Sequence, residues 1–167
     1  LLGRVQGEVV LPGQNEELSL NGTDSIATML PEVGYPYVVE FEINPDKDQN
    51  INGILFKGPH STDMQWENKG KLAFSRDGYT FVFHAATLPA GAWTKVRIEG
   101  DHKGTTLYIN GEKAERLEGR VKQFYNYTHK RKDKMYMQET LVFPMRQIGD
   151  VQNGFRGKLR NIIARNK

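Results

Sequence analysis

Acidic residues at alternate positions are the first feature of this sequence that could do chemistry. Hydrolysis of a glycosidic bond on a sheet requires carboxyl groups at alternating strand positions, so that they share one face. Glu40 and Glu42 have this spacing, but the third acid of a Glu-x-Asp-x-x-Glu pattern is missing. We therefore interpret both as the solvated outer face of a strand and predict no catalytic residue.

Aromatic residues in polar surroundings could bind a sugar. Aromatic rings stack on the apolar C–H faces of sugars, while neighbouring polar groups hydrogen-bond the hydroxyls. Trp66 lies among polar residues typical of a turn, and Tyr125 and Tyr127 flank an asparagine. These three are our candidate carbohydrate-binding residues. The alternative for each is packing beneath a loop, and for Trp93 we favour that structural role.

Metal chemistry has one candidate segment. Its oxygen-bearing side chains resemble the first half of a calcium-binding loop, and they are Asp46, Asp48, Asn50 and Asn52, followed by Gly53. The position of the bidentate glutamate holds Pro59 instead, so we favour a polar strand connection and predict no metal or cofactor, with calcium as the alternative. The sequence has no cysteine, and its four histidines are scattered, which argues against zinc.

Composition limits the partners. The 167 residues fit one domain, residues 1–167, and 23 basic against 20 acidic residues leave a net charge of only +3, which does not favour nucleic acid. No segment approaches the ~20 apolar residues of a membrane-spanning helix. The one basic run, residues 129–134, is expected to be a solvated loop. We expect the isolated module to be monomeric.

Period-two alternation predicts the strands that must position these groups. The clearest covers residues 37–43, and a second covers residues 94–98. Asp77-Gly78 and Asn110-Gly111 are dipeptides typical of tight hairpins. Further strands are expected near residues 141–143 and 157–163, and a weak helix near residues 114–122. Antiparallel hairpins without helices between them predict an all-β sandwich.

Two separated segments resemble laminin G-like domains of the concanavalin A-like class. Residues 93–100 and 105–111 read WTKVRIEG and TTLYING, similar to the central hairpin of that family, and residues 154–162 read GFRGKLRNI, similar to its last strand. The resemblance implies a two-sheet antiparallel jelly-roll sandwich.

A narrower resemblance is to the C-terminal region of bacterial family 20 β-N-acetylhexosaminidases. It rests on LFKGPHS at residues 55–61, KLAFSRDGY at 71–79 and QETLVFP at 138–144. It implies a non-catalytic, carbohydrate-binding accessory module cut from a larger secreted glycoside hydrolase, located in the periplasm, at the cell surface or outside the bacterium. The partner would be a glycan. The alternative is a structural domain that packs against the parent enzyme's catalytic barrel and has no ligand.

Overall fold

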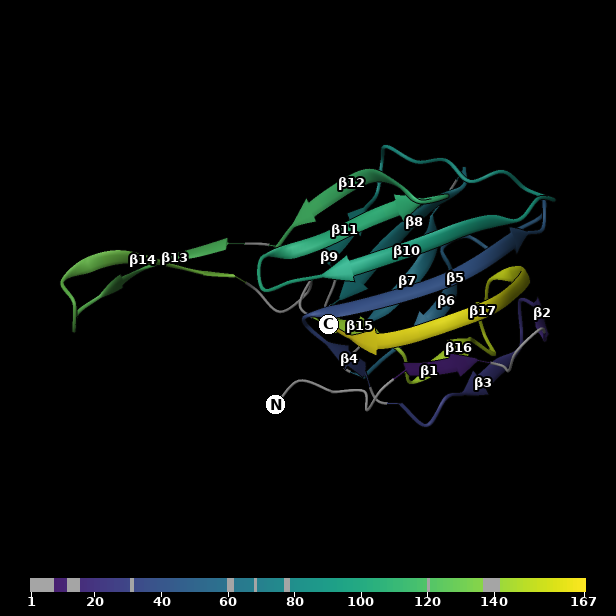
Figure 1. Cartoon of the computed structure of the whole chain (residues 1–167), viewed down its shortest axis with the longest axis horizontal. Helices are drawn as coiled ribbons and strands as arrows, with labels where there is room; N and C mark the ends of the chain where they lie inside the picture. The colour runs from purple at the N-terminus through teal and green to yellow at the C-terminus, as the bar shows by residue number, and fades with distance from the viewer. Residues whose placement is uncertain are drawn as a thin grey trace.

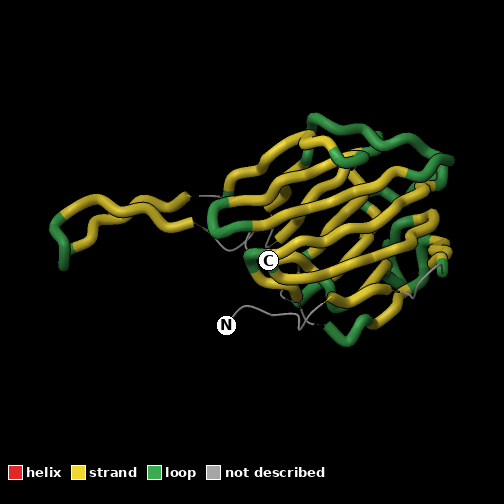
Figure 2. Tube along the Cα trace, viewed as in Figure 1, coloured by secondary structure: helices red, strands yellow, loops and turns green. Residues whose placement is uncertain are grey.

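Two antiparallel sheets face each other in this chain. The computed structural model describes residues 8–11, 16–30, 32–59, 62–67, 69–76, 79–119, 121–136 and 142–167, and these residues contain strands and loops but no helix (Figure 2). The sheets lie one behind the other in Figure 1. The all-β prediction is therefore confirmed.

The first sheet has seven strands in the order β1-β17-β5-β10-β11-β12, and β2 also pairs with β17. The bounds are β1 (Glu8–Leu11), β2 (Glu17–Asn21), β5 (Tyr37–Pro45), β10 (Thr94–Gly100), β11 (Gly104–Ile109), β12 (Glu112–Glu118) and β17 (Arg156–Asn166).

The second sheet has six strands in the order β3-β16-β6-β7-β8-β9. The bounds are β3 (Ser25–Ala27), β6 (Gly53–Lys57), β7 (Asp63–Glu67), β8 (Lys71–Arg76), β9 (Tyr79–Val82) and β16 (Gln147–Gly149). Two smaller pairs complete the strands, namely β4 (Glu32–Gly34) with β15 (Val142–Pro144), and β13 (Val121–Asn126) with β14 (Arg131–Tyr136).

Alternation along β5 and β10 builds one side of the core. Phe41 in β5 is buried and lies directly opposite the buried Val96 of β10. The intervening Glu40 and Glu42 point to the outer face, as predicted from their spacing. A strand in which apolar and polar residues alternate can pack one face into the core and expose the other to water.

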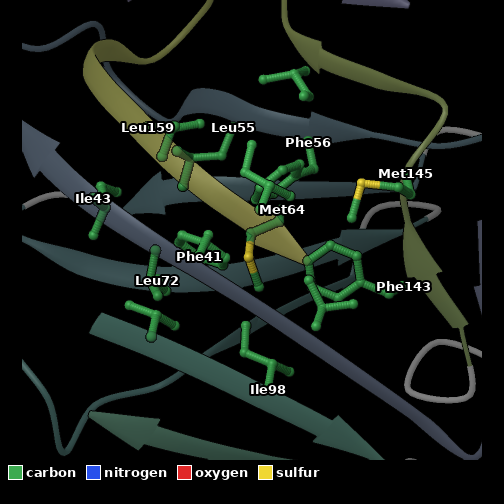
Figure 3. Packing of buried hydrophobic residues seen from close by; sticks show 14 of the residues in the cluster. Phe41, Ile43, Leu55, Phe56, Met64, Leu72, Ile98, Phe143, Met145 and Leu159 are labelled. Carbon is green, nitrogen blue, oxygen red and sulfur yellow. The ribbon is translucent and has the colours of Figure 1, made fainter. Parts of the chain in front are cut away.

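Phenylalanines join the two sheets across the interior, where Figure 3 shows Phe41, Phe56 and Phe143 close together. The ring of Phe56 lies 5.2 Å from that of Phe41 and 5.3 Å from that of Phe143, both edge to face. Each such fully buried side chain contributes roughly 1.5–3 kcal/mol.

The predicted hairpins are present. Asn110 and Gly111 have φ of 50° and 86° between β11 and β12, the left-handed conformations that a type I′ turn requires. Strands β8 and β9 pair through Phe74 and Phe81, as expected. Asp77 and Gly78 themselves, which were to form the turn, lie outside the described residues.

Two local predictions are wrong. Of the expected helix, 114–122, residues 114–118 lie in β12 and residues 121–122 begin β13 instead. Pairing with β11 satisfies the backbone of β12 and lets Ala114 and Leu117 pack against the core. Tertiary pairing overrides helix propensity here. The basic run at residues 129–134 is the turn and part of the second strand of the β13–β14 hairpin rather than a loop, although its side chains are largely exposed as expected.

Candidate functional site

A pocket opens where loops meet strand ends of the second sheet. Its volume is about 500 Å³, within the range of small-molecule sites. Its walls come from the β5–β6 loop (residues 46–52), from Trp66 of β7, from Lys69 and Gly70 after β7, and from Leu88 and Ala90 before β10. The structure thus brings together Trp66 and the oxygen-rich segment, which the sequence singled out separately.

Trp66 forms part of the inner wall and belongs to the core. It alternates with outward-facing Gln65 and Glu67 along β7 and is only 5% exposed. Its ring packs on that of Phe155, with the centroids 5.6 Å apart. The packing role considered for Trp66 is therefore real, and its part in ligand binding stays a prediction.

Side-chain amides hold the pocket loop against the start of β17. The Gln49 amide nitrogen donates to the carbonyl oxygen of Asp46 at 2.9 Å, and its oxygen accepts the backbone N–H of Arg156 at 3.0 Å. The Asn50 amide nitrogen donates to the carbonyl oxygen of Gly154 at 2.9 Å. Hydrogen bonds of this kind fix an irregular backbone. The loop wall is therefore built before any ligand arrives.

These hydrogen bonds also affect whether the loop could bind calcium. Asn50 braces the loop through its amide, while Asp46 and Asp48 are exposed. The described residues contain no group of three or more acidic, histidine or cysteine side chains able to hold a metal ion. The predicted absence of a metal and the calcium alternative are both untested.

Several polar residues lining the pocket have side chains that make no hydrogen bond or ion pair with any described residue. All five are exposed, and they are Asp46, Lys47, Asp48, Asn52 and Lys69. Such groups can exchange water for the hydroxyls of a ligand without breaking an internal bond. The pocket therefore combines an apolar wall with acceptors and donors.

The part of the wall formed by Lys69, Gly70 and Leu88 depends on one glycine. Lys69 and Gly70 have φ of 68° and 88°, and the Leu88 N–H donates to the Gly70 carbonyl oxygen at 2.8 Å. A Cβ on Gly70 would lie 2.8 Å from the carbonyl oxygen of Leu88. The Lys71 ammonium donates to Thr87 Oγ1 at 3.0 Å and ties the same segment to β8. Sequence reasoning missed these residues, because only the fold brings them to Trp66.

Tyr125 and Tyr127 are not part of this pocket. They lie on the β13–β14 hairpin, which projects from the sandwich (Figure 1). They are 46% and 84% exposed, and their rings meet edge to face with centroids 4.8 Å apart. The candidate sugar-binding residues thus occupy two separate places.

The outer face of the first sheet carries a polar network that uses Glu42 and Trp93. Glu42 accepts hydrogen bonds from Asn161 and, at 3.1 Å, from Arg160. The Asn161 bond, followed by the Arg160 bond and charge, lowers the pKa of Glu42 against the opposing effect of burial. The Arg160 guanidinium lies 3.8 Å above the Trp93 ring. The lowered pKa keeps the Glu42 carboxyl group ionised. Trp93 packs against Arg160, and its structural role stays a prediction.

Comparisons with known proteins identify the fold. No protein-family model matches the sequence, and no curated protein matches it. Domain 4 of AbnA, an extracellular GH43 arabinanase from Geobacillus stearothermophilus solved with arabinotriose, has a TM-score of 0.59 at 16% identity, covering 98% of this chain and 79% of that one. A putative carbohydrate binding protein from Bacteroides ovatus has a TM-score of 0.53 at 15% identity, covering 97% and 42%.

At these identities the likeness establishes architecture alone. The hexosaminidase resemblance continues to rest on the sequence motifs. No described helix is long and apolar enough to cross a membrane. The chain is an all-β, two-sheet antiparallel jelly-roll sandwich.

Proposed function

We propose that this chain is a non-catalytic carbohydrate-binding module of a secreted bacterial glycoside hydrolase, and that the pocket beside Trp66 binds the glycan. The observation that carries this proposal is the composition of the pocket. It has about 500 Å³ of space, an apolar wall and polar side chains uncommitted to other described residues.

The apolar and polar walls suit the two faces of a sugar. The edge of Trp66, with Leu88 and Ala90, would contact C–H groups. Asp46 and Asp48 would accept hydrogen bonds from hydroxyls, and Lys69 would donate one. Because hydrogen bonds from side-chain amides already fix the loop, binding costs little conformational entropy.

The wider setting of the module is part of the same proposal. Of the two similar structures described above, one is a domain solved with arabinotriose and the other is a putative carbohydrate binding protein. The motif resemblance supports a β-N-acetylhexosaminidase as the parent enzyme, with residues 1–167 as one module and a location in the periplasm, at the cell surface or outside the cell. Binding would hold the tethered enzyme near its substrate and raise the effective concentration.

The pocket carboxylates favour binding over catalysis. A glycosidase needs two carboxyl groups flanking the scissile bond, one with a raised pKa. Asp46 and Asp48 are exposed and sit two residues apart on one loop. The described carboxyl group whose pKa burial raises is Asp63, which does not line the pocket.

Calorimetric titration tests the proposal. Titrations would use arabinose-, galactose- and N-acetylglucosamine-containing oligosaccharides. We expect Asp48→Ala to weaken binding about tenfold, the effect of losing hydrogen bonds to a charged group, with an unchanged melting temperature. Glu112→Ala, which removes an equally exposed acid from β12, is the matched control and should bind as the unaltered chain does.

The opposite result would favour the structural alternative. No binding up to millimolar sugar would contradict the proposal. If deleting the module then also destabilised the parent enzyme, its role would be to pack against the catalytic barrel.

A further inference from the structure

The β13–β14 hairpin, residues 121–136, forms an arm that extends away from the sandwich (Figures 1 and 2). Among the described strands, β13 and β14 pair only with each other. Nearly every described side chain of the arm is exposed, with Asn126 and Asp133 the partly buried exceptions. Isolated two-stranded hairpins are marginal in water, so the arm needs internal ties.

Those ties use the only acidic residue of the arm. Asp133 accepts a hydrogen bond from the Asn126 amide at 2.7 Å and pairs with the Arg131 guanidinium at 2.8 Å. Asn126 Oδ1 accepts the backbone N–H groups of Thr128 and His129. Arg131 is thus neutralised, and the turn is fixed.

Register separates the remaining side chains into two faces. Tyr125 lies opposite Lys132, and Gln123 opposite Lys134, so these four share one face. We call it the tyrosine–lysine face. Neither lysine makes an ion pair with any residue that the structure describes.

The opposite face of the arm is different. It carries the exposed Phe124, Met135 and Lys122 together with the Arg131–Asp133 ion pair. Phe124 and Met135 therefore lie on the other side of the ribbon from the lysine pair, whereas Val121, which is 44% exposed, shares the tyrosine–lysine face.

Charge is concentrated on the arm. Its 16 residues hold five of the 23 basic residues and one of the 20 acidic residues, a net charge of +4. The rest of the chain, with 18 basic and 19 acidic residues, is close to neutral at −1. The arm therefore carries the whole positive excess of the protein, which steers anions toward it.

We propose that the tyrosine–lysine face binds an anionic polysaccharide, one bearing carboxylate or sulfate groups. Lys132 and Lys134 are two positions apart, roughly 6.7 Å along the strand, and would pair with acidic groups along the polymer. Tyr125 and Tyr127 would lie against its sugar rings. This binding goes beyond the pocket and does not depend on it.

A membrane surface fits the arm less well. A segment that lies on anionic lipid buries an apolar face with cations at its border. Here Phe124 and Met135 lie on the face away from Lys132 and Lys134, and Lys122 is the single cation on their face that makes no ion pair with a described residue. The polysaccharide is therefore the partner that the arrangement favours.

The test measures binding of the full chain to dextran sulfate and polygalacturonate, with neutral dextran as the uncharged probe. We expect both anionic polymers to bind, more weakly as salt rises, and neutral dextran not to bind. Lys132→Ala/Lys134→Ala should weaken binding at least about tenfold, the loss of two charge contacts. Lys113→Ala/Lys158→Ala changes net charge equally on exposed positions of the sandwich and should have little effect.

A second pair of variants separates the faces without changing charge. Tyr125 and Phe124 are neighbours with 46% and 42% exposure on opposite faces. Tyr125→Ser should weaken binding several-fold, and Phe124→Ser should not.

Three results would overturn the proposal. Equal binding of neutral dextran would show that charge is irrelevant. Equal losses in the two double-lysine variants would show that net charge, rather than the arm, attracts the polymer. Tighter binding to phosphatidylserine vesicles, abolished by Phe124→Ser, would assign the arm to membranes instead.

Discussion

Replacing Gly70 by alanine tests how the pocket beside Trp66 is built. Gly70 has a φ of 88°, and a Cβ there would lie 2.8 Å from the Leu88 carbonyl oxygen. The same glycine accepts the Leu88 N–H at 2.8 Å. An added methyl group would push the Leu88 segment outward and stretch this hydrogen bond.

The expected cost has two parts. The left-handed backbone costs an alanine about 1 kcal/mol. Displacing Leu88 and weakening its hydrogen bond adds roughly 1–2 kcal/mol. The free energy of unfolding should therefore fall by about 2–3 kcal/mol.

Gly91 supplies a matched control. Its φ is 74°, and a Cβ there would have no atom within 4 Å. Gly91→Ala should therefore lose only the backbone part, about 1 kcal/mol. Urea denaturation of both variants gives the two losses, and titration with the pocket's ligand should show weaker binding only for Gly70→Ala.

The outcome that contradicts this reasoning is simple to recognise. Equal destabilisation of the two variants, with equal ligand affinity, would mean that the Leu88 segment adapts freely. The pocket wall would then be soft, and the preformed shape on which the proposed function relies would be lost.

Three other predictions concern stability. Gly100→Ala should lower the melting temperature because its Cβ would lie 2.1 Å from the buried Tyr37 ring, and Tyr37→Leu should offset most of that loss in a double-mutant cycle. Arg116 lowers the pKa of Asp101 to about 2, so the stability that this pair contributes is present above pH 3.8 and is lost as the pH falls through about 2. Asp101→Asn should remove this pH dependence of the urea midpoint. The corresponding change in the free energy of unfolding should be at most about 1 kcal/mol, since the pair is half exposed. Burial raises the pKa of Asp63, so the fold has its full stability below pH 3.8, where this carboxyl group is neutral, and loses stability as the pH rises and the group ionises. Asp63→Asn should therefore raise the urea midpoint at pH 7 and leave it unchanged at pH 3. A lower midpoint at pH 7 would contradict this.

The alternation of apolar and polar residues predicted the strands that have one buried face and one solvent-exposed face. Residues 37–43 and 94–98 became β5 and β10 for that reason. Alternation also contained a signal for Trp66 that went unused, since Met64 and Trp66 share one side of β7 between polar neighbours. An inward-facing tryptophan could have been predicted from that spacing.

The arm and the pocket could not be predicted in the same way. Both faces of the arm are exposed to solvent, so polar and apolar residues do not alternate along its strands. Only the strand register, which pairs Lys132 with Tyr125, shows which residues share a face. The pocket joins three stretches distant in sequence, namely residues 46–52, Trp66 with Gly70, and Leu88 with Ala90. Contacts of that kind depend on how the sheets stack, which a one-dimensional pattern does not encode.

Strand β17 has a consequence for how the protein is made. It pairs with β5 along one edge and with β1 and β2 along the other. During synthesis those earlier strands leave the ribosome before their central partner exists, with unpaired edges that can aggregate. The first sheet can be completed only after β17 has been translated, and its assembly is expected to be slow because this strand pairing is long-range.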